Sequence, residues 1–202
     1  GGGADGCITA GQLHWLERRL EEVHTSFRSR DGTSVTSENE DRLVVILSHH
    51  PYATLTNPRS HPSSGRSGRE DPAAVHADPN RLLETLLRFG NVVLWLNGHI
   101  HANHIQAHQD EGHDGGGCWE VITISIVDWP CQGRVVELIE AGEGLLAIAC
   151  TMVDHEGSEL GALHRELAGN EPAARFGSGR AGTPPDRTVI PPARPPFSPA
   201  AQ

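Results

Sequence analysis

Two short runs of apolar residues, 43–47 and 92–96, lie between strongly polar segments of the chain. Each run has the length and the β-branched content of a buried strand. Between them, Asp78-Pro79 is typical of a helix start, with a capping side chain followed by proline, and it predicts a helix over 81–89 that ends at Gly90. A strand, a helix and a strand in this order favour a parallel pair with a right-handed crossover.

The pattern on either side of this unit predicts further elements. Apolar residues at helical spacing predict a helix over 12–23. Runs at 120–127, 134–139 and 145–153, the last two joined by a glycine-rich turn at 141–144, predict three strands of an antiparallel meander that packs as a second sheet. Ser158 is expected to cap a short helix that reaches about Leu167. Together these patterns predict a layered α/β sandwich, with parallel core strands followed by the meander.

Composition divides the chain into a domain and a tail. Hydrophobic residues make up only 37% of the sequence, and the polar stretches 25–41 and 57–79 are expected to be flexible loops. Residues 169–202 carry much of the proline and are expected to be a disordered tail, because they cannot bury enough apolar surface to offset their ordering entropy. Residues 1–168 are therefore the predicted domain.

Charge and cysteine spacing exclude several classes of site. The formal net charge of −10 argues against binding to a nucleic-acid backbone, which needs clustered basic residues. The four cysteines show no C-x-x-C spacing, which argues against a zinc ribbon. No run of eighteen apolar residues predicts a membrane span. Localisation stays open between cytoplasmic and exported.

Histidines follow both apolar runs that predict the parallel strands. His49-His50-Pro51 follows the first run, and Gly98-His99-Ile100-His101 follows the second. Ligands of open α/β sheets gather at the carboxyl ends of the strands, and neutral imidazole is the commonest metal ligand in proteins. In an extended segment His99 and His101 would point to the same side. The sequence therefore predicts a metal site at these strand ends, with ordinary polar loops as the alternative.

These motifs resemble the C-terminal half of the calcineurin-like metallophosphoesterases, which carry an H-x-P-type element and a later G-H-x-H element, each after a core strand. The segments 97–103 and 117–123, together with Asp128-Trp129-Pro130 and Arg134, are similar to an actinobacterial branch of that family. The resemblance covers roughly residues 7–170. It implies that the chain forms the C-terminal half of a metallophosphoesterase-like sandwich.

The resemblance does not extend to the other three blocks of the family. The motifs D-x-H, G-D-x-x-D and G-N-H-[D/E] do not occur in this sequence. The expectation is therefore a fragment that lacks the N-terminal metal ligands. A two-metal phosphoesterase needs bridging carboxylates, whereas three imidazoles can hold one borderline-soft ion. Two divalent ions (manganese, iron or zinc) are implied for the complete enzyme, and at most one for this chain.

The resemblance also implies roles for individual residues. His49 and His99 would bind one metal ion and His101 the other. His50 would be a catalytic group that faces the phosphate or supports a ligand, with a plain loop histidine as the alternative. Asn103 and His104 would line the substrate pocket. Asn97 either orients a ligand imidazole through its side chain or serves as a turn residue. His108, His113 and Asp114 lie in a glycine-rich stretch. We expect this stretch to be a flexible loop, and a weak metal-binding tract is the alternative.

The implied activity is metal-dependent hydrolysis of a phosphate ester, with a small phosphate ester as the partner. The alternative is an inactive remnant that binds one metal ion or a protein. Parallel core strands are normally covered on both faces. A half-domain is therefore expected to associate through an uncovered face of its sheet.

Overall fold

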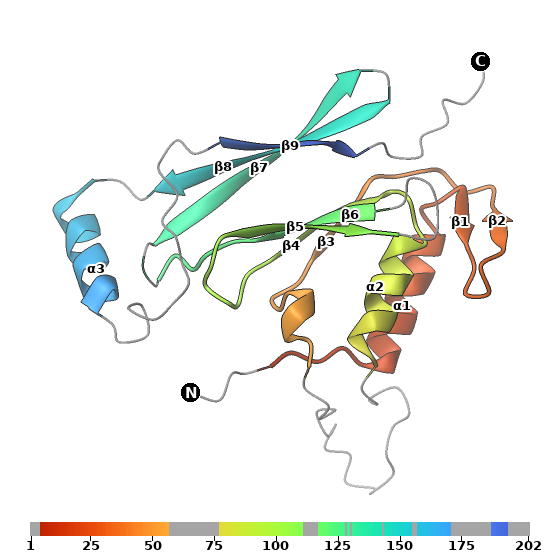
Figure 1. The fold of residues 1–202 in the computed structure, drawn as a ribbon, viewed down its shortest axis with the longest axis horizontal. Coiled ribbons are helices and arrows are strands. Elements are labelled where there is room, and N and C mark those ends of the chain that lie inside the picture. The colour runs from red at the N-terminus through yellow and green to blue at the C-terminus, as the bar shows by residue number, and fades with distance from the viewer. Residues whose placement is uncertain are drawn as a thin grey trace, which may run out of the picture.

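The polypeptide is arranged in three layers, with two helices, a four-stranded mixed sheet and a second antiparallel sheet stacked on one another (Figure 1). The computed structural model describes residues 5–56, 77–110, 117–127, 129, 131–142, 144–154, 157–170 and 187–193. The chain forms both helices and strands, and the strands of the central sheet pair in both parallel and antiparallel directions, so the predicted mixed α/β class is confirmed.

The central sheet contains the two predicted parallel strands. Its order is β3 (Val44–Leu47), β4 (Val92–Asn97), β6 (Gly117–Ile122) and β5 (His104–Gln109). Strand β4 pairs in parallel with β3 on one side and with β6 on the other, and β5 closes the sheet antiparallel to β6. The carboxyl ends of β3 and β4 therefore lie at the same edge of the sheet, as the sequence predicted.

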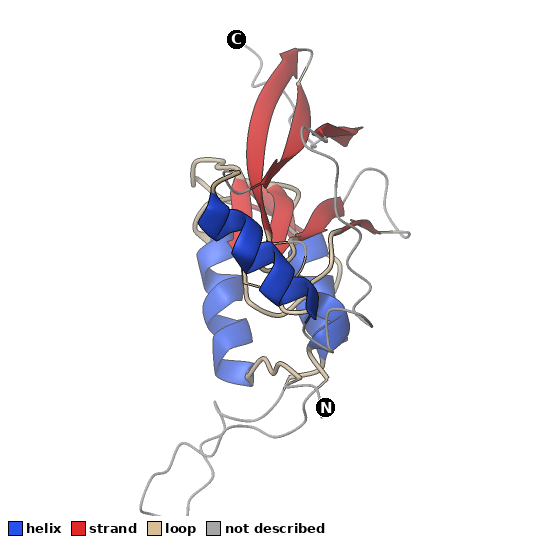
Figure 2. Cartoon of the chain, turned by 90° about the vertical axis from the view of Figure 1, so that its left-hand side faces the viewer, coloured by secondary structure: helices blue, strands red, loops and turns tan. Residues whose placement is uncertain are grey.

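Helices α1 (Ala10–Glu21) and α2 (Pro79–Leu87) cover one face of this sheet (Figures 1 and 2). Thr9 and Gln12 form a capping box at the start of α1, and the Asp78 side chain accepts a hydrogen bond from the Asn80 backbone at the start of α2. Both predicted helices are confirmed, each beginning two residues earlier than expected. The layer is closed by one apolar cluster that includes Leu13, Leu20, Leu86, Phe89 and Trp95. Among the described residues, no helix is both long enough and apolar enough to cross a membrane.

The opposite face of the central sheet packs against β7 (Gln132–Gly142), β8 (Leu145–Asp154) and β9 (Arg187–Ala193), which form an antiparallel sheet in this order. Leu94 and Val121 meet Ile148 and Cys150 in the core between the two sheets. Helix α3 (Glu159–Asn170) follows β8, and the Ser158 hydroxyl accepts from the Gly161 backbone at 3.2 Å, as predicted for its cap.

The predicted three-stranded meander is wrong in one strand. The apolar run expected as 120–127 forms β6, which ends at Ile122 and belongs to the central sheet rather than to the second one. Its last three residues are all buried, as expected of a strand covered on both faces. The strand β5 was not predicted, because its sequence has only two apolar residues, Ile105 and Ala107. Hydrophobic periodicity predicts that a segment forms a strand, but it does not predict which sheet the strand joins.

The stretch 25–41, expected as a flexible loop, contains a hairpin of β1 (Ser26–Arg28) and β2 (Ser34–Thr36). Turn chemistry rather than apolar alternation specifies it. Asp31 accepts from the Thr33 backbone at 3.0 Å, and Gly32 has the positive φ of 86° that the turn requires. Residues 57–76 of the second expected loop, 57–79, lie outside the described residues. Most of the expected tail also lies outside them, and its described part includes β9.

Strand β3 is at the edge of the central sheet, and its outer side chains are not covered by the second sheet. Leu47 is 75% exposed and Val45 is 37% exposed, although both lie on a strand whose other side chains join the core. Association through this surface stays a prediction.

A buried carboxylate joins α1 to α2 and to the hairpin. Glu17 of α1 is 5% exposed and accepts from Arg88 Nη2 at 2.7 Å and from Arg30 Nε at 2.9 Å. The hydrogen bond from Arg30 lowers the pKa of Glu17 most, and the contacts with Arg88 lower it further. Burial raises it, and the net result is a pKa of about 2. The folded state therefore binds the Glu17 proton less tightly than the unfolded chain does.

We expect Glu17→Gln to lower the free energy of unfolding by about 2–3 kcal/mol at pH 7, because the ionised form is favoured by folding. This contribution is complete above the unfolded pKa of about 4.5 and disappears as the pH falls through about 2. Urea unfolding followed by circular dichroism between pH 7 and pH 2 measures it. Glu22→Gln, in an exposed ion pair with Arg19, is the matched control and should change stability by less than about 0.5 kcal/mol. A Glu17→Gln deficit that does not shrink with acid would contradict the assignment.

Candidate metal site

The loops that follow β3 and β4 are held side by side by backbone hydrogen bonds. Ser48 N donates to Leu96 O, and Gly98 N donates to His49 O, each at 3.1 Å, so the parallel ladder continues beyond the strands. The Trp95 indole also donates to the Ser48 hydroxyl at 2.7 Å. These bonds place the first histidine of each motif at the same edge of the sheet.

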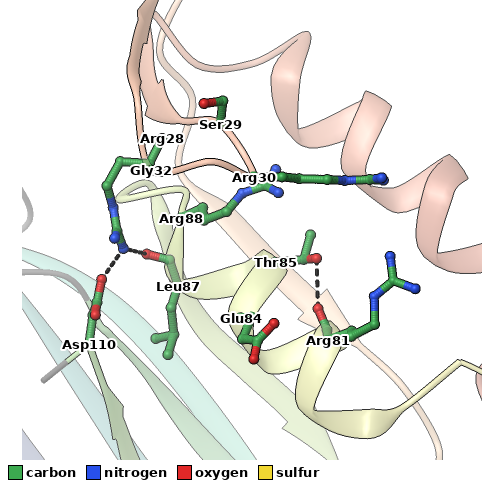
Figure 3. Close-up of a pocket in the computed structure, with 10 residues that line it drawn as sticks. All are labelled: Arg28, Ser29, Arg30, Gly32, Arg81, Glu84, Thr85, Leu87, Arg88 and Asp110. Atoms are coloured by element: carbon green, nitrogen blue, oxygen red, sulfur yellow. Dashed lines mark hydrogen bonds and ion pairs between the residues drawn. The ribbon is translucent and has the colours of Figure 1, made fainter. Parts of the chain in front are cut away.

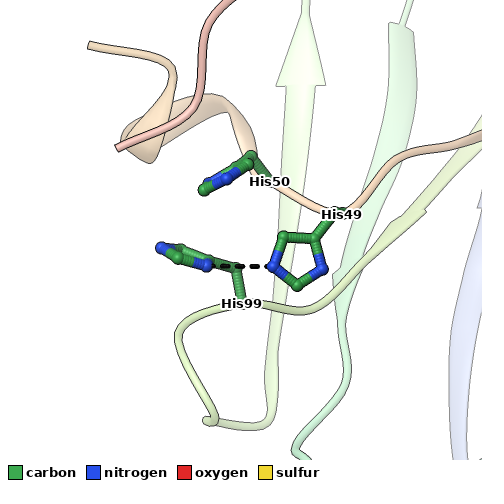
Figure 4. Close-up of side chains that lie close together, drawn as sticks. All are labelled: His49, His50 and His99. Carbon is green, nitrogen blue, oxygen red and sulfur yellow. Dashed lines mark hydrogen bonds between the residues drawn. The ribbon is translucent and has the colours of Figure 1, made fainter. Parts of the chain in front are cut away.

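Three imidazoles meet at this edge, as Figure 4 shows. One nitrogen from each of His49, His50 and His99 lies within 4.8 Å of the other two. His49 Nε2 and His99 Nδ1 are 3.1 Å apart, and the rings of His50 and His99 have their centroids 3.9 Å apart. Nitrogens bound tetrahedrally to zinc at 2.0–2.1 Å are about 3.3–3.4 Å from each other. The distance between the His49 and His99 nitrogens is close to this spacing, and a nitrogen of His50 lies within 4.8 Å of both.

The orientation of His50 is fixed from two sides. Its Nδ1 is 3.1 Å from the hydroxyl of Thr54, which lies in the short 3-10 helix η1 (Tyr52–Thr54) and itself donates to Pro51 O at 3.2 Å. A Thr54 hydroxyl that donates to Pro51 O favours Nδ1 as the donor of this contact, and this tautomer leaves Nε2 of His50 unprotonated for an ion. On the other side, a Cβ added at Gly6 would come within 2.4 Å of His50 Cγ. The N-terminal segment therefore packs on the ring, and Gly6 donates its N–H to Thr54 O at 2.7 Å.

Electrostatics favour the neutral imidazoles that metal binding needs. Burial lowers the pKa of His50, and the neighbouring His99 and His49 lower it further. Burial likewise lowers the pKa of His99, with added repulsion from His49 and His101. The carboxylate of Asp5 acts in the opposite direction on both groups, which places its negative charge beside the cluster. Asp5 was not expected near the site, because it belongs to no motif.

A buried carboxylate behind the cluster ties the histidine loops to the sheet. Glu120 of β6 is 2% exposed and accepts from the Tyr52 backbone at 2.9 Å, from Asn97 Nδ2 at 2.6 Å and from His108 Nε2 at 2.8 Å. Burial raises the pKa of Glu120, but the hydrogen bonds outweigh burial and hold this pKa below its ordinary value. Sequence reasoning missed Glu120, whose only signal was a charged residue within an apolar strand.

The same network assigns two residues that the sequence left open. Asn97 is neither a turn residue nor a partner of a ligand imidazole. It is the last residue of β4, and its amide supports Glu120. His108 lies in β5 rather than in a flexible loop, and it is 5% exposed. His113 and Asp114, from the same glycine-rich stretch, are outside the described residues, as are Asp128 and Pro130.

His101 does not join the cluster within the described structure. The expected extended geometry is absent, because His99 has φ of 65° and His101 has φ of 49°, which turns the segment instead of letting both side chains face one way. Gly98, which precedes them, has no positive φ. Histidine is among the residues that adopt the left-handed region more often than most.

The two residues expected to line a substrate pocket lie further along the chain. His104 is the first residue of β5 and is exposed. Asn103 is half-buried, and its Oδ1 accepts from the Ile124 backbone at 3.2 Å and from Arg134 Nη2 at 3.0 Å. Asn103 therefore links the central sheet to β7 of the second sheet, which is a structural role.

Comparisons with known proteins leave the family of this chain open. No protein-family model matches the sequence, and no curated protein matches it. The similarity to calcineurin-like metallophosphoesterases thus stays a prediction from the motifs. The chemistry of the site rests on the geometry of its imidazoles.

We expect Glu120→Gln to weaken binding of zinc by about 10–100-fold, because a neutral amide accepts the Tyr52 and Asn97 hydrogen bonds more weakly than a carboxylate does and can no longer accept from His108. It should also lower the free energy of unfolding by about 1–3 kcal/mol, since a buried donor is left unpaired. Competition with a chromophoric chelator measures the affinity, and urea unfolding measures the stability. Glu140→Gln, on the exposed part of β7, is the matched control. Unchanged zinc affinity in a folded Glu120→Gln protein would show that the carboxylate does not position the histidines.

We expect Gly6→Ala to weaken zinc binding about tenfold or more, because the new methyl group cannot share the space of the His50 ring. The affinity is again measured by chelator competition, and the thermal midpoint shows whether the fold is intact. Gly133→Ala is the control, since a Cβ there meets no atom within 4 Å. Equal affinities in the two variants would mean that the N-terminal segment does not hold His50.

Proposed function

We propose that this protein binds one divalent transition-metal ion through His49, His50 and His99, and that the site serves a metal-dependent phosphoesterase. The observation that carries the proposal is the convergence of three imidazole nitrogens within 4.8 Å at the carboxyl end of two parallel strands. The phosphoesterase part rests in addition on the resemblance of the two histidine motifs.

The donor set fits zinc or iron better than a hard ion. Three nitrogens and no carboxylate within the described cluster favour a borderline-soft metal, whereas magnesium and calcium prefer oxygen ligands. Such an ion would supply Lewis-acid polarisation of a phosphoryl oxygen. His49 is exposed, so a phosphate ester in solution can reach the edge of the sheet.

The chain's own residues would prepare the site for this chemistry. Thr54 selects the tautomer of His50, Glu120 fixes the two loops, and the left-handed backbone of His99 turns its ring toward His49. The charge of Asp5 offsets part of the mutual repulsion of the imidazoles when they are protonated.

The second candidate function is a metal-binding module without hydrolytic activity. It is favoured by the lack of any carboxylate in the described histidine cluster, since a dinuclear centre needs at least one to bridge its ions. Metal content and turnover therefore have to be measured separately.

We expect the purified chain, loaded with zinc and dialysed, to retain about one ion per chain by elemental analysis. His99→Asn should bind zinc at least about tenfold more weakly, because it removes a ligand while keeping a residue that tolerates a positive φ. His14→Asn, on the exposed face of α1, is the control. Retention of zinc by His99→Asn would contradict the site.

Two further measurements separate the alternatives. His101→Asn should lose less affinity than His99→Asn, and an equal loss would restore the ligand set that the sequence predicted. Hydrolysis of an aryl phosphate by the loaded protein, lost in His99→Asn, would support the phosphoesterase. Tight zinc binding with no hydrolysis of mono- or diesters would favour the binding module.

A further inference from the structure

A pocket of about 380 Å³ lies between the hairpin β1–β2 and one face of α2, and four arginines line it (Figure 3). Its charged lining residues are Arg28, Arg30, Arg81, Glu84, Arg88 and Asp110. The chain has sixteen basic residues, all of them arginine, and a net charge of −10. A quarter of its positive side chains thus meet at one pocket of an acidic protein.

The pocket is at the opposite end of the central sheet from the histidines. Arg88 comes four residues before β4, whereas His99 follows the carboxyl end of that strand. A six-residue strand spans about 20 Å. The pocket is therefore a separate site, and its ligand chemistry is independent of the function proposed for the histidine cluster.

The lining of the pocket has more positive than negative side chains. Arg28 pairs with Asp110 and donates to Leu87 O at 3.3 Å, which covers an end carbonyl of α2. Arg30 and Arg88 share the single carboxylate of Glu17. The pocket lining itself, four arginines against Glu84 and Asp110, carries two positive charges, which Glu17 and Glu21 offset from α1. A bound anion would face this positive lining.

The hydrogen-bond donors of Arg30 and Arg88 are not all satisfied within the described part of the protein. Arg88 Nε is buried and has no hydrogen-bond partner among the described residues. A buried donor without an acceptor is unfavourable, so a ligand oxygen that reaches Arg88 Nε would stabilise the site. The side chain of Arg30 beside it is 59% exposed, so a ligand can reach the pair from solvent.

The position of Arg81 is also unfavourable for the helix alone. It is the third residue of α2, where a positive charge opposes the helix dipole. Arg81, Thr85 and Arg88 lie on one face of α2 at steps of four and three residues, which puts Arg81 about 10 Å from Arg88 along the axis. This placement extends the basic lining beyond the Arg30–Arg88 pair.

We propose that this pocket binds a small organic phosphate, with the phosphate group on Arg30 and Arg88 and the remainder of the molecule along α2 toward Arg81. Guanidinium groups match the oxygens of phosphate in bidentate geometry and remain charged at all physiological pH values. The pocket volume is within the range of small-molecule sites.

The test is calorimetric titration of the metal-free, chelator-treated chain at low salt with inorganic phosphate, glycerol 1-phosphate and acetate. We expect a Kd of about 1 mM or tighter for the two phosphates and no measurable binding of acetate. Tighter binding of glycerol 1-phosphate would show that the organic part contributes, and equal binding would show that the phosphate group alone is recognised. Acetate binding as tight as phosphate binding, or no phosphate binding up to about 10 mM, would overturn the proposal.

Variants locate the bound phosphate. Arg30→Gln should weaken phosphate binding about tenfold and Arg81→Gln should weaken glycerol 1-phosphate more than inorganic phosphate. Arg30→Gln keeps the contact between Arg88 and Glu17, and circular dichroism checks that it folds. Arg42→Gln, at a 69% exposed arginine outside the pocket, is the matched control. Equal losses in Arg30→Gln and Arg42→Gln would show that only the overall charge matters and would overturn the assigned site.

Discussion

The candidate site depends on one buried carboxylate. Glu120 lies on the central strand β6, and it accepts hydrogen bonds from the loop after β3, from the end of β4 and from β5. An ionised carboxylate at 2% exposure is costly unless each oxygen is paired, so these three donors and Glu120 require one another. Because the donors come from segments far apart in the chain, the interaction forms only when the sheet has its full order. The geometry of the histidines is thus coupled to the completed fold.

The elements that the sequence predicted well are those whose signal is local. Helices α1 and α2 were expected within two residues, since capping residues and apolar spacing are read over one or two turns. The parallel pairing of β3 and β4 followed from the strand–helix–strand order. The sheet membership of β6 was not predictable in this way, because it depends on which strands have an open edge. Strand β5 was missed because pairing with β6, rather than its own apolar content, makes it a strand.

The site shows the same division between local and distant information. The convergence of His49 and His99 follows from their places after two parallel strands, and both positions were expected. The cluster contains His50 and not His101. The reason lies in the backbone, because the extended geometry expected for 99–101 is replaced by two left-handed residues. Thr54 and Gly6, which hold the His50 ring, belong to no motif and are recognisable only from their contacts in the structure. Asn103, expected to line the substrate pocket, has a side chain that links the two sheets, and its place beside a substrate stays a prediction.

The central sheet separates two kinds of chemistry. The carboxyl end of β4 leads to neutral imidazoles suited to a cation, while its amino end is next to guanidinium groups suited to an anion. The length of the strand, about 20 Å, exceeds the screening distance of about 8 Å at physiological ionic strength. Charge added at one end therefore acts only weakly through solvent on the other. Any coupling between the ends has to pass through the packed residues between them. Strand β4 is buried along nearly its whole length and pairs with both β3 and β6, so it lies on such a path.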